Sequence, residues 1–140
     1  NATNKQHCFV VLTPALQVLR QCLVKQDGNG TFLVCAFLWS AVYGVDANKT
    51  LVYEEGRQLL VETGIKWRKT RVMYTLSGVV WHLTSLSQEC ADYFAVEMLH
   101  LIVEFLASEI AKNEARESFV PCLCVAMCSI YTSRYVSDPQ

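Results

Sequence analysis

The residues best suited to chemistry are three cysteines near the end of the chain, Cys122, Cys124 and Cys128. Cys124 and Cys128 are four residues apart, so on a helix they share a face and can offer two thiolate ligands to a metal ion. The spacing differs from the paired Cys-x-x-Cys of structural zinc sites, and the neighbouring Val, Ala, Met and Ile favour inert thiols. We therefore interpret these cysteines as core residues. A helical metal or enzyme domain built on them stays as an alternative.

The histidines do not form a catalytic pattern with any nucleophile. His7 and Cys8 are adjacent, so on a helix their side chains diverge by about 100°. His82 follows a tryptophan in an apolar segment, and His100 lies elsewhere. The glycine-rich stretch 27–31, "DGNGT", has neither the lysine nor the spacing of a phosphate-binding loop. We expect no catalytic residue, no metal, no cofactor and no small-molecule substrate, and hence a protein that is not an enzyme.

The composition indicates one globular domain. The chain has 140 residues, of which 52% are hydrophobic and 18% charged, with a formal net charge of -1. A charge near zero provides no general attraction to nucleic acid or to an anionic membrane. The longest apolar stretch, 32–45, is shorter than the roughly 20 residues that span a bilayer. Because the chain begins with Asn1, we expect it to be part of a larger protein.

Apolar residues recur at spacings of three and four, which indicates helices throughout and no strands. Examples are Leu16, Leu19 and Leu23. The predicted helices are 10–25, 31–44, 48–54, 57–67, 70–86, 89–96, 97–112 and 116–133. The stretch "QDGNG" is predicted to be a turn, because glycine and asparagine tolerate positive φ.

The sequence repeats itself after 42 residues. At that shift Trp39 aligns with Trp81, and "LLVE" at 59–62 aligns with "LIVE" at 101–104. Leu38 aligns with Val80, Val52 with Phe94, and Glu55 with Glu97. At a shift of 44, Leu76, Val79, Val80 and Leu83 align with Val120, Leu123, Cys124 and Met127. The chain therefore contains two strong copies of one unit, flanked by part of a third.

A period near 42 with three helices per unit resembles the armadillo/HEAT class of helical repeats. The stretch "NKTLVYEEG-RQLLVE" (48–62) resembles the armadillo pattern, in which a short first helix ends near a glycine. "VCAFLWSAV" and "LSGVVWHLTSL" resemble its second helix. The resemblance implies an all-α, right-handed α-solenoid of about three repeats in a single domain, 1–140. It also implies a left-handed Gly56 at a sharp corner between 48–54 and 57–67, while Met98 replaces this glycine in the next copy.

The resemblance further implies a non-catalytic scaffold that holds a protein partner in a groove formed by the third helices, 13–25, 57–67 and 97–110. Leu16, Leu60 and Ile102 would be their core residues, and Val18 would face the groove together with the residues that follow. The groove residues would be Pro14, Gln17, Gln58, Val61, Glu62, His100, Val103 and Glu104. Because these side chains are mixed in character, we expect the partner to be a helix or an extended segment.

One basic cluster stands out, the stretch "KWRKTR" at 66–71. Lys66, Trp67, Arg68, Lys69 and Arg71 form a candidate patch for an acidic partner, with the tryptophan as an anchor. No wider basic field surrounds it, so nucleic acid is the less favoured ligand. An exposed turn kept polar by its charges is the simpler interpretation.

The cellular compartment has two interpretations. The seven cysteines are odd in number and most lie in apolar runs, which indicates reduced core residues and an intracellular protein, cytoplasmic or nuclear. The alternative is a secreted, N-glycosylated, disulfide-containing helical ligand or receptor-binding domain. It is suggested by three sequons, which begin at Asn1, Asn29 and Asn48.

Overall fold

The computed structural model describes residues 9–112, and these form helices joined by short turns. The helices are α2 (Phe9–Lys25), α3 (Gly28–Val42), α4 (Asp46–Lys66), α5 (Val72–Thr84), α6 (Gln88–Glu97) and α7 (Leu99–Ala111). No strand occurs in this part of the chain, so the all-α prediction is confirmed there. The predicted helix 116–133 lies outside the described residues.

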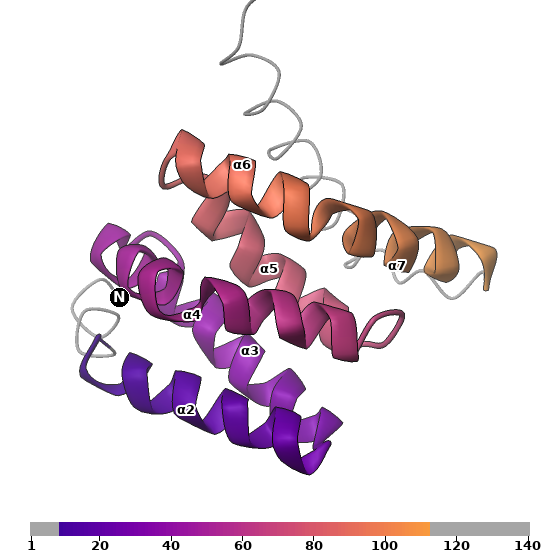
Figure 1. Cartoon of the computed structure of the whole chain (residues 1–140), viewed down its shortest axis with the longest axis horizontal. Coiled ribbons are helices and arrows are strands. Elements are labelled where there is room, and N and C mark those ends of the chain that lie inside the picture. Colours follow the sequence, from indigo (N-terminus) through magenta and orange to yellow (C-terminus); the bar gives the residue numbers. More distant parts are fainter. Residues whose placement is uncertain (1–8, 113–140) are drawn as a thin grey trace, which may run out of the picture.

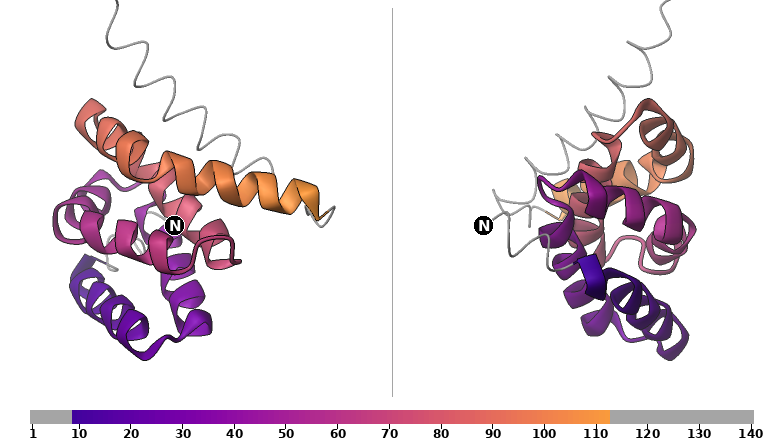
Figure 2. Two further views of the ribbon diagram at one scale, coloured as in Figure 1. Left: turned by 45° about the vertical axis from the view of Figure 1, so that its right-hand side comes forward. Right: turned by 90° about the vertical axis from the view of Figure 1, so that its left-hand side faces the viewer.

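The helices are arranged in two groups. Figure 1 shows α2, α4 and the α6–α7 pair lying side by side, with α3 and α5 crossing behind them. Figure 2 gives the same arrangement from two further sides. All of these helices contribute to one hydrophobic core, which includes Leu12, Leu38, Leu60, Leu76 and Ile102. The helices behind are therefore packed against those in front through shared apolar side chains.

The helix boundaries follow the repeat of the sequence. From the end of α3 at Val42 to the end of α5 at Thr84, and from the start of α4 at Asp46 to the start of α6 at Gln88, the spacing is 42 residues. The aligned apolar pairs Leu38 and Val80, Val52 and Phe94, and Leu60 and Ile102 are all fully buried. The prediction that these positions face the core is confirmed.

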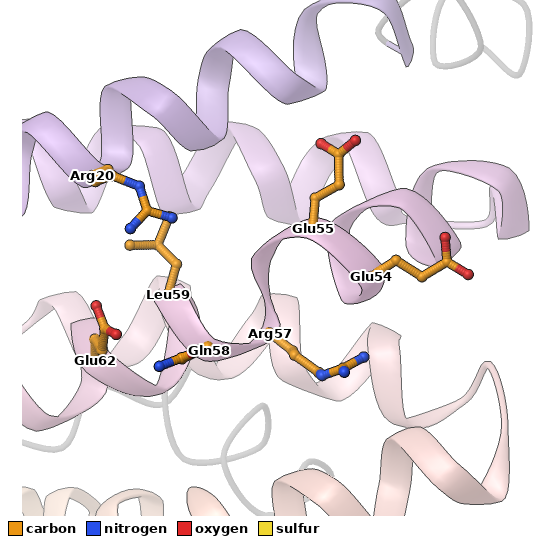
Figure 3. Close-up of a pocket in the computed structure, with 7 residues that line it drawn as sticks. All are labelled: Arg20, Glu54, Glu55, Arg57, Gln58, Leu59 and Glu62. Atoms are coloured by element: carbon orange, nitrogen blue, oxygen red, sulfur yellow. The ribbon is translucent and has the colours of Figure 1, made fainter.

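The predicted corner at Gly56 is wrong. Residues 46–66 form one helix, and Gly56 lies within it without a positive φ. The ribbon of α4 bends near Arg57, as Figure 3 shows, but the helix is not interrupted there. The left-handed glycine of the described chain is Gly44, which follows α3 with a φ of 73°.

The turn between α2 and α3 also differs from the prediction. Gln26 takes the positive φ of 57°, and Gly28 already belongs to α3. The helix can begin this early because the Asp27 side chain accepts a hydrogen bond from the backbone N–H of Gly30, at 2.9 Å. An aspartate in this position satisfies one of the free N–H groups at the start of a helix.

Three glycines inside helices mark the places where neighbouring helices come close. A Cβ on Gly56 would lie 2.8 Å from Cδ2 of Leu16 in α2, and a Cβ on Gly64 would lie 2.9 Å from Cε of Met98, just before α7. In α5, a Cβ on Gly78 would collide with the ring of Trp39 from α3. The absence of a side chain at these positions allows α4 to lie between α2 and α7, and α5 to pack against α3.

Candidate functional site: a polar groove between α2 and α4

A groove with a volume of about 240 Å³ lies between α2 and α4. Its lining residues are Arg20, Glu54, Glu55, Arg57, Gln58, Leu59 and Glu62. Figure 3 shows the Arg20 side chain reaching from α2 toward Leu59, while the other six residues come from α4. Two of the predicted groove residues, Gln58 and Glu62, belong to this lining.

Contacts with neighbouring side chains hold several of these groups in place. The hydroxyl of Thr13 donates a hydrogen bond to Oε2 of Glu55, at 2.7 Å, and so ties α2 to α4. The guanidinium of Arg57 lies 5.0 Å from the ring centre of Tyr53 and 5.7 Å from that of Tyr93 in α6. Cations over aromatic rings in this range are attracted by the electron-rich ring faces. Arg57 therefore joins the groove to the next unit of the chain.

The lining carries an excess of one negative charge, because it has three glutamates and two arginines. Burial raises the pKa of the Tyr53 and Tyr93 hydroxyls, and nearby glutamates raise it further. Both tyrosines therefore remain neutral at physiological pH. The groove can accept hydrogen bonds from a basic side chain and donate them from Arg20, Arg57 and Gln58.

Most of the predicted groove residues are accessible. Leu16, Leu60 and Ile102 are buried, as the repeat predicted. Pro14, Gln17, Val18, Gln58, Glu62, His100 and Val103 are exposed on α2, α4 and α7. Val61 is an exception: only 7% of it is exposed, because it packs into the hydrophobic core, so it does not line a groove.

Glu104, predicted as a groove residue, instead pairs with the basic cluster. Its carboxylate accepts two hydrogen bonds from Arg68, at 3.0 Å from Nε and 2.8 Å from Nη2, and lies 3.5 Å from Nζ of Lys69. The Arg68 hydrogen bonds lower the pKa of Glu104, and the same contact raises the pKa of Arg68. The predicted groove and the predicted basic patch therefore meet between the end of α4 and α7.

The other aromatic and basic groups of this cluster pack against the start of α3. The ring of Trp67 covers Gly28, where a Cβ would lie 3.1 Å from Cζ3. Arg71 donates a hydrogen bond to Oδ1 of Asn29, and its guanidinium lies 4.7 Å from the ring centre of Phe32. Lys66 is exposed at the end of α4. Arg68 and Arg71 therefore already have polar partners within the chain, whereas the Trp67 ring is packed but its buried Nε1 has no hydrogen-bond partner among the described residues.

The described cysteines and His82 are buried among packed side chains, whereas His100 is exposed. Cys22, Cys35 and Cys90 are buried free thiols, which fits the prediction that most of the cysteines are reduced core residues. Burial, with a smaller effect of Cys22, raises the pKa of Cys35 to about 12. His82 is buried between the rings of Tyr43 and Trp81, and His100 is exposed. Residues 9–112 contain no cluster of potential metal ligands; His7, Cys122, Cys124 and Cys128 lie outside this range.

The sequon at Asn48 is part of the core. Asn48 is fully buried, and its Nδ2 donates a hydrogen bond of 2.7 Å to the carbonyl of Ala41 near the end of α3. A sugar on Nδ2 would have no space and would disrupt this bond. Asn29, the acceptor of the second sequon, is exposed but accepts the hydrogen bond from Arg71.

Sequence reasoning missed Arg20, Glu54, Glu55, Arg57 and Leu59 as members of the groove. One signal was available: Glu54, Gln58 and Glu62 are four residues apart, so they share one face of an unbroken helix. Dividing this stretch into two helices at Gly56 hid that face.

Comparisons with protein-family models, with curated proteins and with solved structures found no match to this chain. None of the helices within residues 9–112 has the length and apolar character that crossing a lipid bilayer requires.

Proposed function

We propose that the chain is an armadillo-like helical repeat domain that acts as a non-catalytic scaffold or adaptor and holds a partner polypeptide on the face formed by α2, α4 and α7. The observation that carries this proposal is the open groove between α2 and α4, bordered by charged and amide side chains on neighbouring helices. The 42-residue spacing of helix boundaries supports the solenoid architecture.

The partner is a helix or an extended segment with at least one basic side chain. The excess carboxylate in the lining favours a cation. Exposed apolar side chains on the same helices, such as Val18 and Val103, offer contacts to its flanking residues. Aromatic and aliphatic anchors supply most of the affinity in such interfaces.

An intracellular location is part of the proposal. The buried Asn48 amide argues against the secreted alternative, because that alternative uses the sequons. The buried thiols of Cys35 and Cys90, whose pKa values are raised by burial, behave as small core residues that need no oxidised partner.

A selection of peptides from a displayed random library on the purified chain tests the binding function. We expect selected peptides to contain Lys or Arg, and to bind the Glu62→Lys and Glu54→Lys variants about tenfold or more weakly, because each variant replaces a carboxylate of the lining by a cation. Lys25→Glu, at the far end of α2, serves as a charge-reversed control that leaves the affinity unchanged. Peptides that bind the groove variants and the wild type equally well would refute this location of the site.

A further inference from the structure

The contact between α3 and α5 shows which side chains pack together when two helices of this chain meet. Trp39 of α3 packs edge-to-face on Tyr74, with ring centres 5.4 Å apart, and covers Gly78. Four residues beyond Trp39, Tyr43 packs in the same way on His82, at 5.0 Å. Tyr74, Gly78 and His82 are four residues apart and form one stripe along α5. Because both sets of contacts advance toward the C-terminal ends, the two helices run in the same direction.

An equivalent stripe lies on α3, 42 residues earlier. It consists of Phe32, Ala36 and Ser40, which align with Tyr74, Gly78 and His82. A small residue again occupies the middle position. The cavity beside it has a volume of about 310 Å³ and is lined by Ala36, Trp39, Ser40 and Tyr43. Aromatic rings cover the stripe of α5, whereas Ala36 and Ser40 of the α3 stripe border this open cavity.

The side chains next to the α3 stripe are apolar and accessible. Leu33 is 65% exposed and Phe37 is 36% exposed, whereas their counterparts in α5, Thr75 and Val79, are buried. Helix α3 contains no charged residue. In α5 the aromatic rings of α3 cover the stripe around Gly78, so the chain itself indicates what kind of group fits beside Ala36.

We propose that the α3 stripe, together with Leu33 and Phe37, binds a helix of a partner protein that runs parallel to α3. This helix places an aromatic side chain over Ala36 and a second one, four residues later, beside Ser40. Its contact face is uncharged, because α3 offers no charge to pair with it. Arg71, which covers the ring of Phe32, borders the site at the N-terminal end of α3. This surface is distinct from the groove between α2 and α4.

A synthetic peptide of residues 28–43, with lysines added at both ends for solubility, is the probe for this site. It carries Trp39 and Tyr43 at the required spacing, and its binding to the purified chain is measured by fluorescence anisotropy. We expect saturable binding that becomes about tenfold or more weaker for a peptide with Trp39→Ala. The same loss is expected for Leu33→Glu and Ser40→Arg in the protein. Both positions are exposed, so these variants should keep the fold, which circular dichroism checks.

Two variants of the protein are controls. Val24→Glu changes an exposed valine on α2, and Glu62→Lys changes the groove, so neither should alter the affinity for this peptide. Absence of saturable binding, or equal affinity for wild type, Leu33→Glu and Ser40→Arg, overturns the proposal. The latter result would mean that the peptide replaces α3 on α5. Weaker binding to Glu62→Lys would place the peptide in the groove and would also overturn it.

Discussion

The side chain of Leu16 in α2 fills the space in which a Cβ of Gly56 in α4 would stand, with Cδ2 only 2.8 Å from that position. Both residues are buried. The glycine therefore acts through its missing side chain and not through an unusual backbone conformation. This contact brings α2 and α4 together beside the polar groove.

Gly56→Val should lower the free energy of unfolding by about 1–3 kcal/mol, because the added methyl groups overpack the contact with Leu16. Denaturant unfolding of the single variants and of the double variant with Leu16→Ala gives the measurement. Leu16→Ala alone is expected to cost about 2–5 kcal/mol as a core truncation.

The double variant separates the two possible causes. If Leu16 is the obstacle, Gly56→Val costs less in the Leu16→Ala background, so the two effects are not additive. Additive costs would instead indicate a backbone restriction at Gly56 that is independent of its neighbour.

The sequence alone could not distinguish these causes, because a left-handed turn and a close helix contact both require a residue without a Cβ. Gly56 follows an apolar segment, as a glycine after a helix end does, although the two glutamates before it are unfavourable at the C-terminus of a helix. The burial of Leu38, Val52 and Phe94 was predictable, because a repeated apolar spacing reports which face meets the core. What each helix packs against depends on side chains distant in sequence.

Glu104→Gln should reduce stability in a pH-dependent way. Because hydrogen bonds from Arg68 hold the pKa of Glu104 below its ordinary value of 4.5, the ion pair stabilises the folded state above that pH. This stabilisation is lost as the pH falls through the lowered pKa. Melting temperatures measured between about pH 3 and pH 7 should therefore differ most at neutral pH and converge in acid. A constant difference across this range would contradict the assignment.

Asn48→Ala should lower the free energy of unfolding by about 1–3 kcal/mol, because the buried carbonyl of Ala41 loses its side-chain donor. Thr50→Ala is the matched control. It removes the same sequon but affects only an exposed hydroxyl, which donates to the carbonyl of Asp46. Urea unfolding of both variants compares them, and equal, small effects would show that the Asn48 amide is not structural.

Cys35 should resist alkylation while the protein is folded. With a pKa raised to about 12, only about one thiol in ten thousand is a thiolate at pH 8. Mass spectrometry after iodoacetamide treatment should find this cysteine unmodified in buffer and modified in guanidinium chloride. Rapid modification in buffer would mean that the segment around Cys35 opens or is not packed as described.

The candidate site was predictable only in part. Gln58 and Glu62 were found from their offset to a core leucine, since that offset fixes the exposed face of a helix. The pairing of Arg68 with Glu104 joins residues 36 positions apart, and surface charges leave no periodic pattern from which such a pair can be inferred. Val61 was misplaced because Leu59, Leu60 and Val61 are all buried in the core, so the buried face of α4 is wider here than the offset from a single core leucine assumes.

Because α3 carries no charge, the strength of binding to its exposed face should depend on ionic strength differently from the strength of binding to the groove. Contacts to the glutamates and arginines between α2 and α4 weaken as electrolyte is added, because the screening length falls to about 10 Å at 0.1 M. Apolar contacts on α3 are not weakened by charge screening and become stronger in sulfate. A wash at high ionic strength should therefore elute a polypeptide held in the groove while retaining a helix bound to α3.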